Sequence, residues 1–120
     1  MIVYAAADLI WASKIKATAD SVGVPCRPAR SLEMLEARLK DCQVSALLVD
    51  LDKGDEALEL IRRAKVPREG EPTVRVVAWG PHVAKDLLQA ARDAGADEVL
   101  TRGAMDHNLE EILLGLVGRT

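Results

Sequence analysis

Short apolar, β-rich runs alternate with longer segments of helical periodicity along the whole of this 120-residue chain. The expected strands are Ile2–Ala6, Val24–Pro28, Val44–Val49, Val74–Trp79 and Glu98–Thr101. Strict alternation of strand and helix implies parallel strands joined by right-handed crossovers, with helices on both faces of the sheet. The sequence therefore predicts a single α/β domain over residues 1–120, a doubly wound (βα)5 fold with one five-stranded parallel sheet.

Apolar residues between the expected strands recur at helical spacing. These repeats are Trp11, Ile15, Ala19 and Val22; Leu32, Leu35 and Leu39; Leu58 and Ile61; Leu87, Leu88 and Ala91; and Leu109, Ile112, Leu113, Leu116 and Val117. Gly23 and Gly95 are placed to end helices, and Ser31 is placed to begin one. The pair Gly80-Pro81 predicts a proline in the first turn of the fourth helix, with His82 directly after it.

Charge and aromatic content argue against nucleic acid as a partner. The chain has 16 basic and 19 acidic residues, for a net charge of −3, so no positive field would gather phosphate backbones. Aromatic residues make up 2% of the sequence, which removes the stacking platforms on which single-strand binders depend. We expect protein or small-molecule partners instead.

Cysteine usage and the amino terminus favour a cytoplasmic protein. Cys26 and Cys42 are too few and too isolated from histidines to indicate a metal site or a disulfide framework. Met1–Tyr4 has no basic region of the signal-peptide kind, and no apolar run approaches the ~20 residues that span a bilayer. We therefore expect reduced cysteines and no membrane insertion.

An acid ends the apolar run Val44–Asp50 at the point where the chain must turn. In open parallel sheets, ligands bind just beyond the carboxyl ends of the strands. Asp52 follows the same expected strand, and polar residues follow three others, namely Asp8, His82 and Arg102. Because the strand ends meet at one edge, we expect these side chains to form a polar cluster around Asp50.

The chain resembles the receiver domain of bacterial response regulators, with the flavodoxin-like fold of the chemotaxis regulator, over essentially its whole length. The resemblance lies in Leu47–Asp50, in Ala57–Ile61 and above all in Ala90–Leu100, which is similar to the family's AxxAGAxxYLxKP segment. It implies a role in two-component signalling.

Several positions depart from the pattern of active receivers. In those proteins a phosphoacceptor aspartate ends the third strand, an acid pair after the first holds Mg²⁺, a hydroxyl residue ends the fourth and lysine ends the fifth. By this resemblance Asp50 is equivalent to the phosphoacceptor, whereas Ala6, Ala7, Gly80 and Arg102 take the other positions. Alanine offers no carboxylate to Mg²⁺, so the resemblance implies a pseudo-active site.

Two interpretations of the pocket stay open. In the favoured one, Asp50 caps the third helix or pairs with Arg102. Arg102 then either replaces the missing cation or is simply an exposed arginine after a strand. In the other, Asp50 accepts phosphate and forms a weak metal set with Asp8 and Asp52. His82 at a helix start is either part of the pocket or merely solvated.

Catalytic motifs are absent from the sequence. It contains no nucleophile elbow, no metal-ligand spacing and no glycine-rich phosphate loop. We therefore expect no enzyme activity, no catalytic residues and no cofactor, with Mg²⁺ bound only under the phosphoacceptor interpretation.

Three functions remain, in order of preference. The first is an atypical, phosphorylation-independent receiver domain acting as a protein-interaction module. The second is a single-domain response regulator in a phosphorelay, with Asp50 as phosphoacceptor, and the third is a small-ligand sensor.

The resemblance also implies a homodimer through the fourth helix, fifth strand and fifth helix. Trp11 and Trp79 are expected in the core, while Leu9 and Ile10 are expected to form an exposed apolar contact near the pocket.

Overall fold

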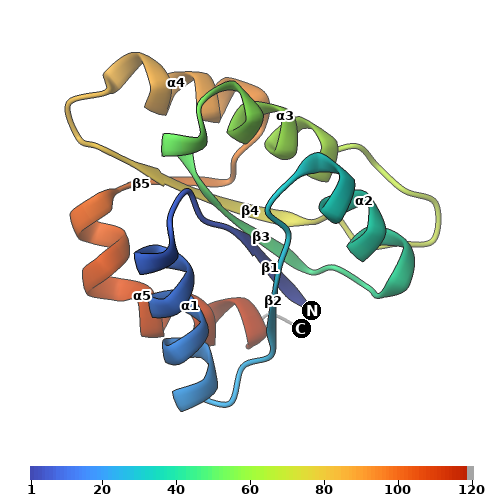
Figure 1. The fold of residues 1–120 in the computed structure, drawn as a ribbon. Helices are drawn as coiled ribbons and strands as arrows, with labels where there is room; N and C mark the ends of the chain where they lie inside the picture. Colours follow the sequence, from blue (N-terminus) through green and yellow to red (C-terminus); the bar gives the residue numbers. More distant parts are fainter. Residues whose placement is uncertain (119–120) are drawn as a thin grey trace.

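Five parallel strands form one sheet in the computed structural model, which describes residues 1–118 (Figure 1). The strands are β1 (Ile2–Ala5), β2 (Cys26–Pro28), β3 (Ala46–Asp50), β4 (Arg75–Gly80) and β5 (Glu98–Thr101), in the order β2-β1-β3-β4-β5. The helices are α1 (Leu9–Ser21), α2 (Leu32–Asp41), α3 (Asp55–Ala64), α4 (Lys85–Ala94) and α5 (Arg102–Val117), with a 3₁₀ turn η1 (Leu51–Lys53) after β3. The predicted doubly wound (βα)5 fold is confirmed.

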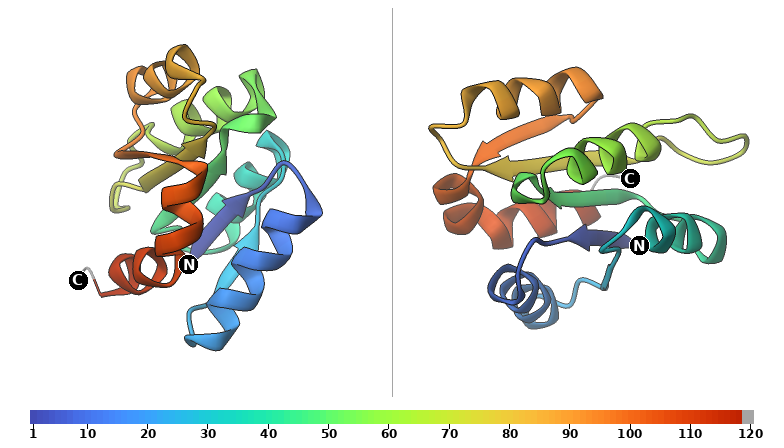
Figure 2. Two further views of the ribbon diagram at one scale, coloured as in Figure 1. Left: turned by 90° about the vertical axis from the view of Figure 1, so that its left-hand side faces the viewer. Right: turned by 45° about the horizontal axis from the view of Figure 1, so that its top comes forward.

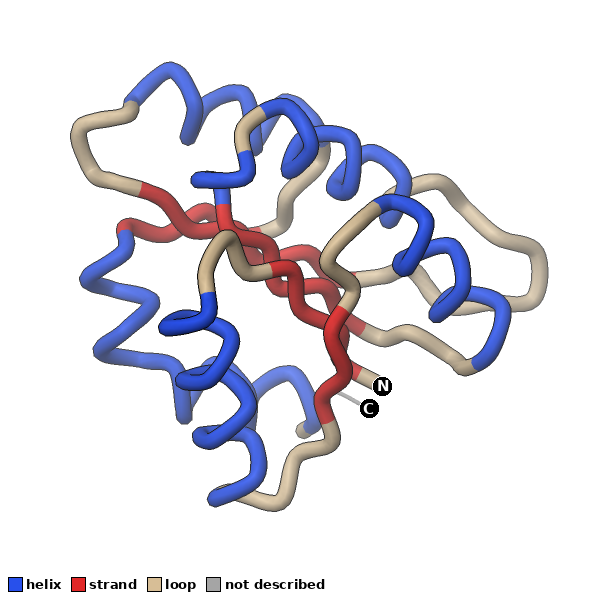
Figure 3. The backbone as a smooth tube through the Cα atoms, viewed as in Figure 1, coloured by secondary structure: helices blue, strands red, loops and turns tan. Residues whose placement is uncertain are grey.

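The helices cover both faces of the sheet, as Figures 1 and 2 show. Helices α1 and α5 pack side by side on one face, and α2, α3 and α4 follow one another on the other. Figure 3 shows the strands as a twisted central layer between the two helical layers. β3 lies at the centre of the sheet, between β1 and β4.

Alternation along β3 divides the core into two parts. Leu47 and Val49 pack in the cluster under α2, α3 and α4, whereas Ala46 and Leu48 pack in the cluster under α1 and α5. All four are at most 1% exposed, and full burial of a leucine side chain is worth about 2 kcal/mol. Asp50 ends this strand and is the one buried charged residue among residues 1–118.

The two tryptophans lie together in the core beneath the carboxyl edge of the sheet. Trp79 is fully buried and Trp11 is 8% exposed, and their ring centroids are 5.1 Å apart. Trp79 is also the β4 residue that lies opposite Asp50 in the register of the sheet. The prediction that both are core residues is confirmed.

Helix boundaries agree with most of the sequence signals. Ser31 caps α2 by accepting a hydrogen bond from the Met34 N–H at 3.1 Å, and Gly95 ends α4 in the left-handed conformation with φ of 116°. The predicted start of the fourth helix is wrong. β4 continues to Gly80, the Ala84 N–H donates to the Pro81 carbonyl to close a turn, and α4 begins at Lys85.

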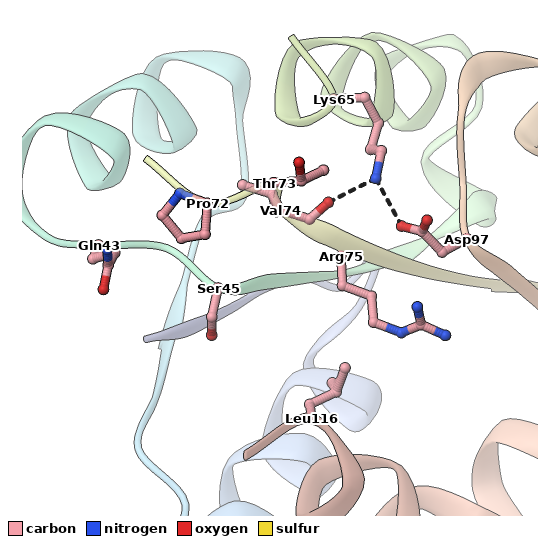
Figure 4. Close-up of a pocket in the computed structure, with 9 residues that line it drawn as sticks. All are labelled: Gln43, Ser45, Lys65, Pro72, Thr73, Val74, Arg75, Asp97 and Leu116. Atoms are coloured by element: carbon pink, nitrogen blue, oxygen red, sulfur yellow. Dashed lines mark hydrogen bonds and ion pairs between the residues drawn. The ribbon is translucent and has the colours of Figure 1, made fainter. Parts of the chain in front are cut away.

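One ion pair and two hydrogen bonds connect α3 to the amino edge of the sheet, where β4 begins (Figure 4). The Lys65 ammonium donates to the Val74 carbonyl at 2.8 Å and pairs with Asp97 at 2.9 Å, while Asp97 also accepts the Val76 N–H at 2.7 Å. Burial acts to raise the pKa of Asp97, but the Val76 N–H and the Lys65 ammonium outweigh it and hold that pKa below its usual value. Lys65 therefore joins the end of α3 to the strands.

No helix within residues 1–118 is long and apolar enough to cross a membrane.

Candidate functional site

Asp50 joins two turns at the carboxyl edge of the sheet. One carboxylate oxygen accepts the Ala7 N–H at 3.0 Å from the turn after β1. The other accepts the Asp52 N–H at 3.0 Å. Asp50 therefore caps η1 and not the third helix as expected, because α3 begins after Gly54. The Asp50 side chain is thus fully buried with both oxygens occupied by backbone donors from different segments.

The electrostatic surroundings of Asp50 oppose its ionisation. Burial is the largest cause that raises the pKa of Asp50, and the nearby Asp52 and Asp8 carboxylates raise it further. The hydrogen bonds from Ala7 and Asp52 act in the opposite direction but do not cancel these effects. No lysine or arginine within residues 1–118 forms an ion pair with Asp50.

Arg102 pairs with Asp52 rather than with Asp50, so the expected Asp50–Arg102 ion pair is wrong. The reason lies in the start of α5: Thr101 accepts the Ala104 N–H at 3.2 Å, and the helix begins at once with Arg102. The Arg102 guanidinium then reaches the exposed Asp52 on η1. Both side chains are at least 40% exposed, and a pair of this kind contributes about 0–1 kcal/mol.

Asp8 is the N-cap residue of α1. Its side chain accepts the Trp11 N–H at 2.8 Å and caps α1. Asp8 and Asp52 are near enough to raise the pKa of Asp50, so three carboxylates gather at this edge. In the part of the chain that the structure describes, no three His, Cys, Asp or Glu side chains are placed to hold a metal ion.

Gly80 ends β4 against a closely packed wall. A Cβ atom at this position would lie 3.2 Å from Leu51 Cβ and 3.5 Å from Leu88 Cδ2. Leu51 is fully buried, so little room is left for a hydroxyl side chain where active receivers carry one. His82, two residues on, is exposed in the turn before α4 and not at a helix start as expected.

Sequence reasoning missed the backbone donors and the packing residue of this site. The Asp50 carboxylate bonds the N–H two residues on, which is the geometry of an Asx turn, and the pattern Asp50-Leu-Asp52 is compatible with such a turn. The role of Leu51 as the wall next to Gly80 has no comparable local signal. It follows from the burial of η1 against β4.

A pocket of about 340 Å³ opens beside this cluster. Its lining comes from the end of β1, the start of α1 and the chain at and after the end of β2: Tyr4, Ala6, Ala7, Asp8, Leu9, Ala12, Pro28 and Arg30. Leu9 and its neighbour Ile10 are 78% and 77% exposed, so the expected exposure of these two apolar side chains is confirmed.

No protein-family model and no curated protein matches the sequence. Solved structures do match. A putative response regulator from Chloroflexus aurantiacus is 18% identical, with a TM-score of 0.80 over 98% of this chain and 97% of that one. A response regulator from Thermotoga maritima is 23% identical, with a TM-score of 0.75 over 97% and 95%.

A third similar structure contains a receiver domain together with a partner. It is the co-crystal structure of the Saccharomyces cerevisiae histidine phosphotransfer protein Ypd1 with the receiver domain of its downstream response regulator Ssk1. The match is 17% identical, with a TM-score of 0.72 over 93% of this chain and 84% of that one. These similarities, together with the strand order and the aspartate that ends β3, show that this protein has the fold of response-regulator receiver domains.

Proposed function

We propose that this chain is an atypical receiver domain that acts as a protein-interaction module in a cytoplasmic bacterial signalling pathway, without accepting a phosphoryl group. The observation that supports this proposal is the environment of Asp50. The carboxylate is buried, both its oxygens accept backbone N–H groups, and it has no cationic partner within residues 1–118. Such an aspartate is suited to holding two turns in place.

The residues around Asp50 do not fit Mg²⁺. This ion keeps several waters but needs one or two carboxylates in octahedral geometry. Ala6 and Ala7 offer no side-chain oxygen, Asp8 is engaged by the Trp11 N–H, and Asp52 is paired with Arg102. Without the ion, the charge of an incoming phosphoryl group would meet three carboxylates, which is unfavourable.

The apolar start of α1 supports the proposed binding role. Leu9 and Ile10 are more than three-quarters exposed and adjoin the turn that Asp50 holds. Large exposed apolar side chains next to each other are typical of contact surfaces. We propose that a protein partner docks here. The dimer through α4, β5 and α5 remains a second possible contact, with Leu114 and Val117 exposed on α5.

Phosphorylation chemistry tests the proposal directly. The purified protein would be incubated with acetyl phosphate and Mg²⁺, and its intact mass followed by mass spectrometry. We expect no phosphorylated species from the wild type, as from Asp50→Asn. A phosphorylated species that is lost in Asp50→Asn would contradict the proposal.

The second candidate is a phosphoacceptor in a phosphorelay, and the gathering of Asp8, Asp50 and Asp52 favours it. Capture experiments with wild-type and Asp50→Asn protein separate the two candidates. An interaction module retains its partners in the variant, whereas a phosphoacceptor loses those that depend on the phosphorylated state. Ile10→Asp is a second test variant, because a charge on the exposed α1 surface should abolish capture by an interaction module.

A further inference from the structure

The pocket beside the Asp50 turn has the size and lining of a small-molecule site. Its volume of about 340 Å³ falls within the range of roughly 300–1,000 Å³ that is usual for ligand pockets. Six of the eight lining residues are apolar or aromatic, and the other two, Asp8 and Arg30, carry opposite charges. Pockets of this kind bind the body of a ligand by apolar contact and orient it by a few polar groups.

Small side chains leave this space open. Ala6, Ala7 and Ala12 line the pocket, where longer side chains would take up part of its volume. Acidic side chains at positions 6 and 7 would also bring negative charge into it. The place is favourable as well, because open α/β sheets bind ligands beyond the carboxyl ends of their strands. The pocket lies at the ends of β1 and β2, on the side of β1 away from β3.

Arg30 is the group that defines the chemistry of the ligand. Asp8 is already an acceptor for the Trp11 N–H. Arg30 is exposed, and none of the hydrogen bonds or ion pairs among residues 1–118 involves its side chain. A guanidinium presents paired N–H donors that match a carboxylate or a phosphate. Tyr4, Leu9 and Pro28 supply apolar walls for the remainder of the molecule.

We propose that this pocket binds a small amphipathic anion, with its apolar body against Tyr4, Leu9 and Pro28 and its carboxylate or phosphate at Arg30. The site goes beyond the proposed function and stands whether or not Asp50 accepts phosphate. A bound ligand would cover Leu9, which also belongs to the proposed docking surface. Occupancy of the pocket would then alter partner binding.

Nuclear magnetic resonance titration with simple probes tests the site. Benzoate and phenyl phosphate would be added to ¹⁵N-labelled protein, with benzamide as the uncharged control. We expect saturable shifts of the Ala7, Leu9, Ala12 and Arg30 amides with millimolar dissociation constants, and about tenfold weaker binding of benzamide. The stronger of the two acids identifies carboxylate or phosphate as the preferred group.

Two variants and a control complete the test. Arg30→Gln should weaken the acids about tenfold, while Ala12→Leu should fill the pocket and abolish the shifts. Arg27→Gln removes a neighbouring exposed arginine outside the pocket and should bind like the wild type. The dispersion of each spectrum shows that the variant is folded. The proposal fails if neither acid moves these amides, or if Arg30→Gln binds the acids as well as the wild type does.

Discussion

The surroundings of a buried or half-buried carboxylate shift its pKa in opposite directions at the two edges of the sheet. At the amino edge, Asp97 accepts a backbone N–H and contacts Lys65 at 2.9 Å, and its pKa lies below the usual value. At the carboxyl edge, Asp50 accepts two backbone N–H groups and is more deeply buried, yet its pKa is raised because no cation offsets the burial. The ion pair of Asp97 with Lys65 stabilises the fold. Asp50 has no cationic partner within residues 1–118 and lies at the edge where a functional site is expected.

The costs of the two arrangements differ accordingly. An ionised group in a protein interior is unfavourable unless hydrogen bonds and opposite charge replace its water. Asp97 has both kinds of compensation, while Asp50 has hydrogen bonds alone. Asp50 nevertheless holds the turn after β1 and η1 in fixed positions, and those segments border the apolar surface of Leu9 and Ile10.

The largest expected effect comes from removing the Lys65–Asp97 ion pair at the amino edge of the sheet. Lys65→Met leaves the Asp97 carboxylate and the Val74 carbonyl without their ammonium partner, and we expect it to lower the free energy of unfolding by about 2 kcal/mol. Urea unfolding followed by circular dichroism measures this change. Lys16→Met removes an exposed pair with Asp20 and serves as the control, with an expected loss below about 0.5 kcal/mol. Equal losses in the two variants would refute the proposed role of Lys65.

The next effect concerns the packed wall of the carboxyl edge. Gly80→Thr forces a side chain against Leu51 and Leu88, and we expect a loss of about 1–2 kcal/mol from overpacking. Gly115→Ala is the matched control in α5, where a Cβ atom meets nothing within 4 Å. It should stabilise the protein by about 0.5–1 kcal/mol, because alanine favours helix over glycine. Thermal unfolding of both variants checks the opposite signs.

A smaller effect distinguishes the two aspartates by pH. The folded-state pKa of Asp97 is lowered, so its stabilisation is present above the ordinary carboxyl pKa of about 4 and is lost as the pH falls through the folded value. The folded-state pKa of Asp50 is raised, so its ionisation costs stability as the pH rises from about 4 through that higher value.

Asp50→Asn should therefore gain stability relative to the wild type as the pH rises from acid to neutral, whereas Asp97→Asn should lose stability relative to it. Urea midpoints measured across this range provide the comparison. The same direction of change in both variants would show that the two carboxylates do not differ as described.

The smallest expected effect is the net change in Asp50→Asn at neutral pH. The amide removes a buried charge but turns one acceptor oxygen into a donor that faces a backbone N–H. These contributions oppose each other, so we expect the free energy of unfolding to change by less than about 1 kcal/mol. A loss of several kcal/mol would contradict the description of Asp50 as a buried charge without an opposite charge beside it.

Much of the fold could be predicted because its signals are local. The apolar run that ends in Asp50 fixed the central strand within two residues, β5 was predicted with its observed bounds, and Ser31 caps α2 through a short-range bond. The start of α4 was misplaced because a proline after a strand is compatible with a turn as well as with a helix. β4 continues to Gly80, and the turn follows it.

The candidate site was harder to predict because it depends on three-dimensional distances. Sequence places both Asp50 and Asp52 within reach of an arginine after β5, but the immediate start of α5 directs Arg102 to Asp52. The pocket likewise requires Tyr4, Ala12 and Arg30 to meet from three segments. No spacing pattern in the chain reports such a meeting.

We propose that Asp50 forms a closed structural site and not a phosphoryl-accepting one. The most direct measurement records the amide resonances of Ala7 and Asp52, the two donors to Asp50, during titration with Mg²⁺ and beryllofluoride. If Asp50 is such a site, both resonances stay in place. Saturable shifts of both, abolished by Asp50→Asn, would contradict it.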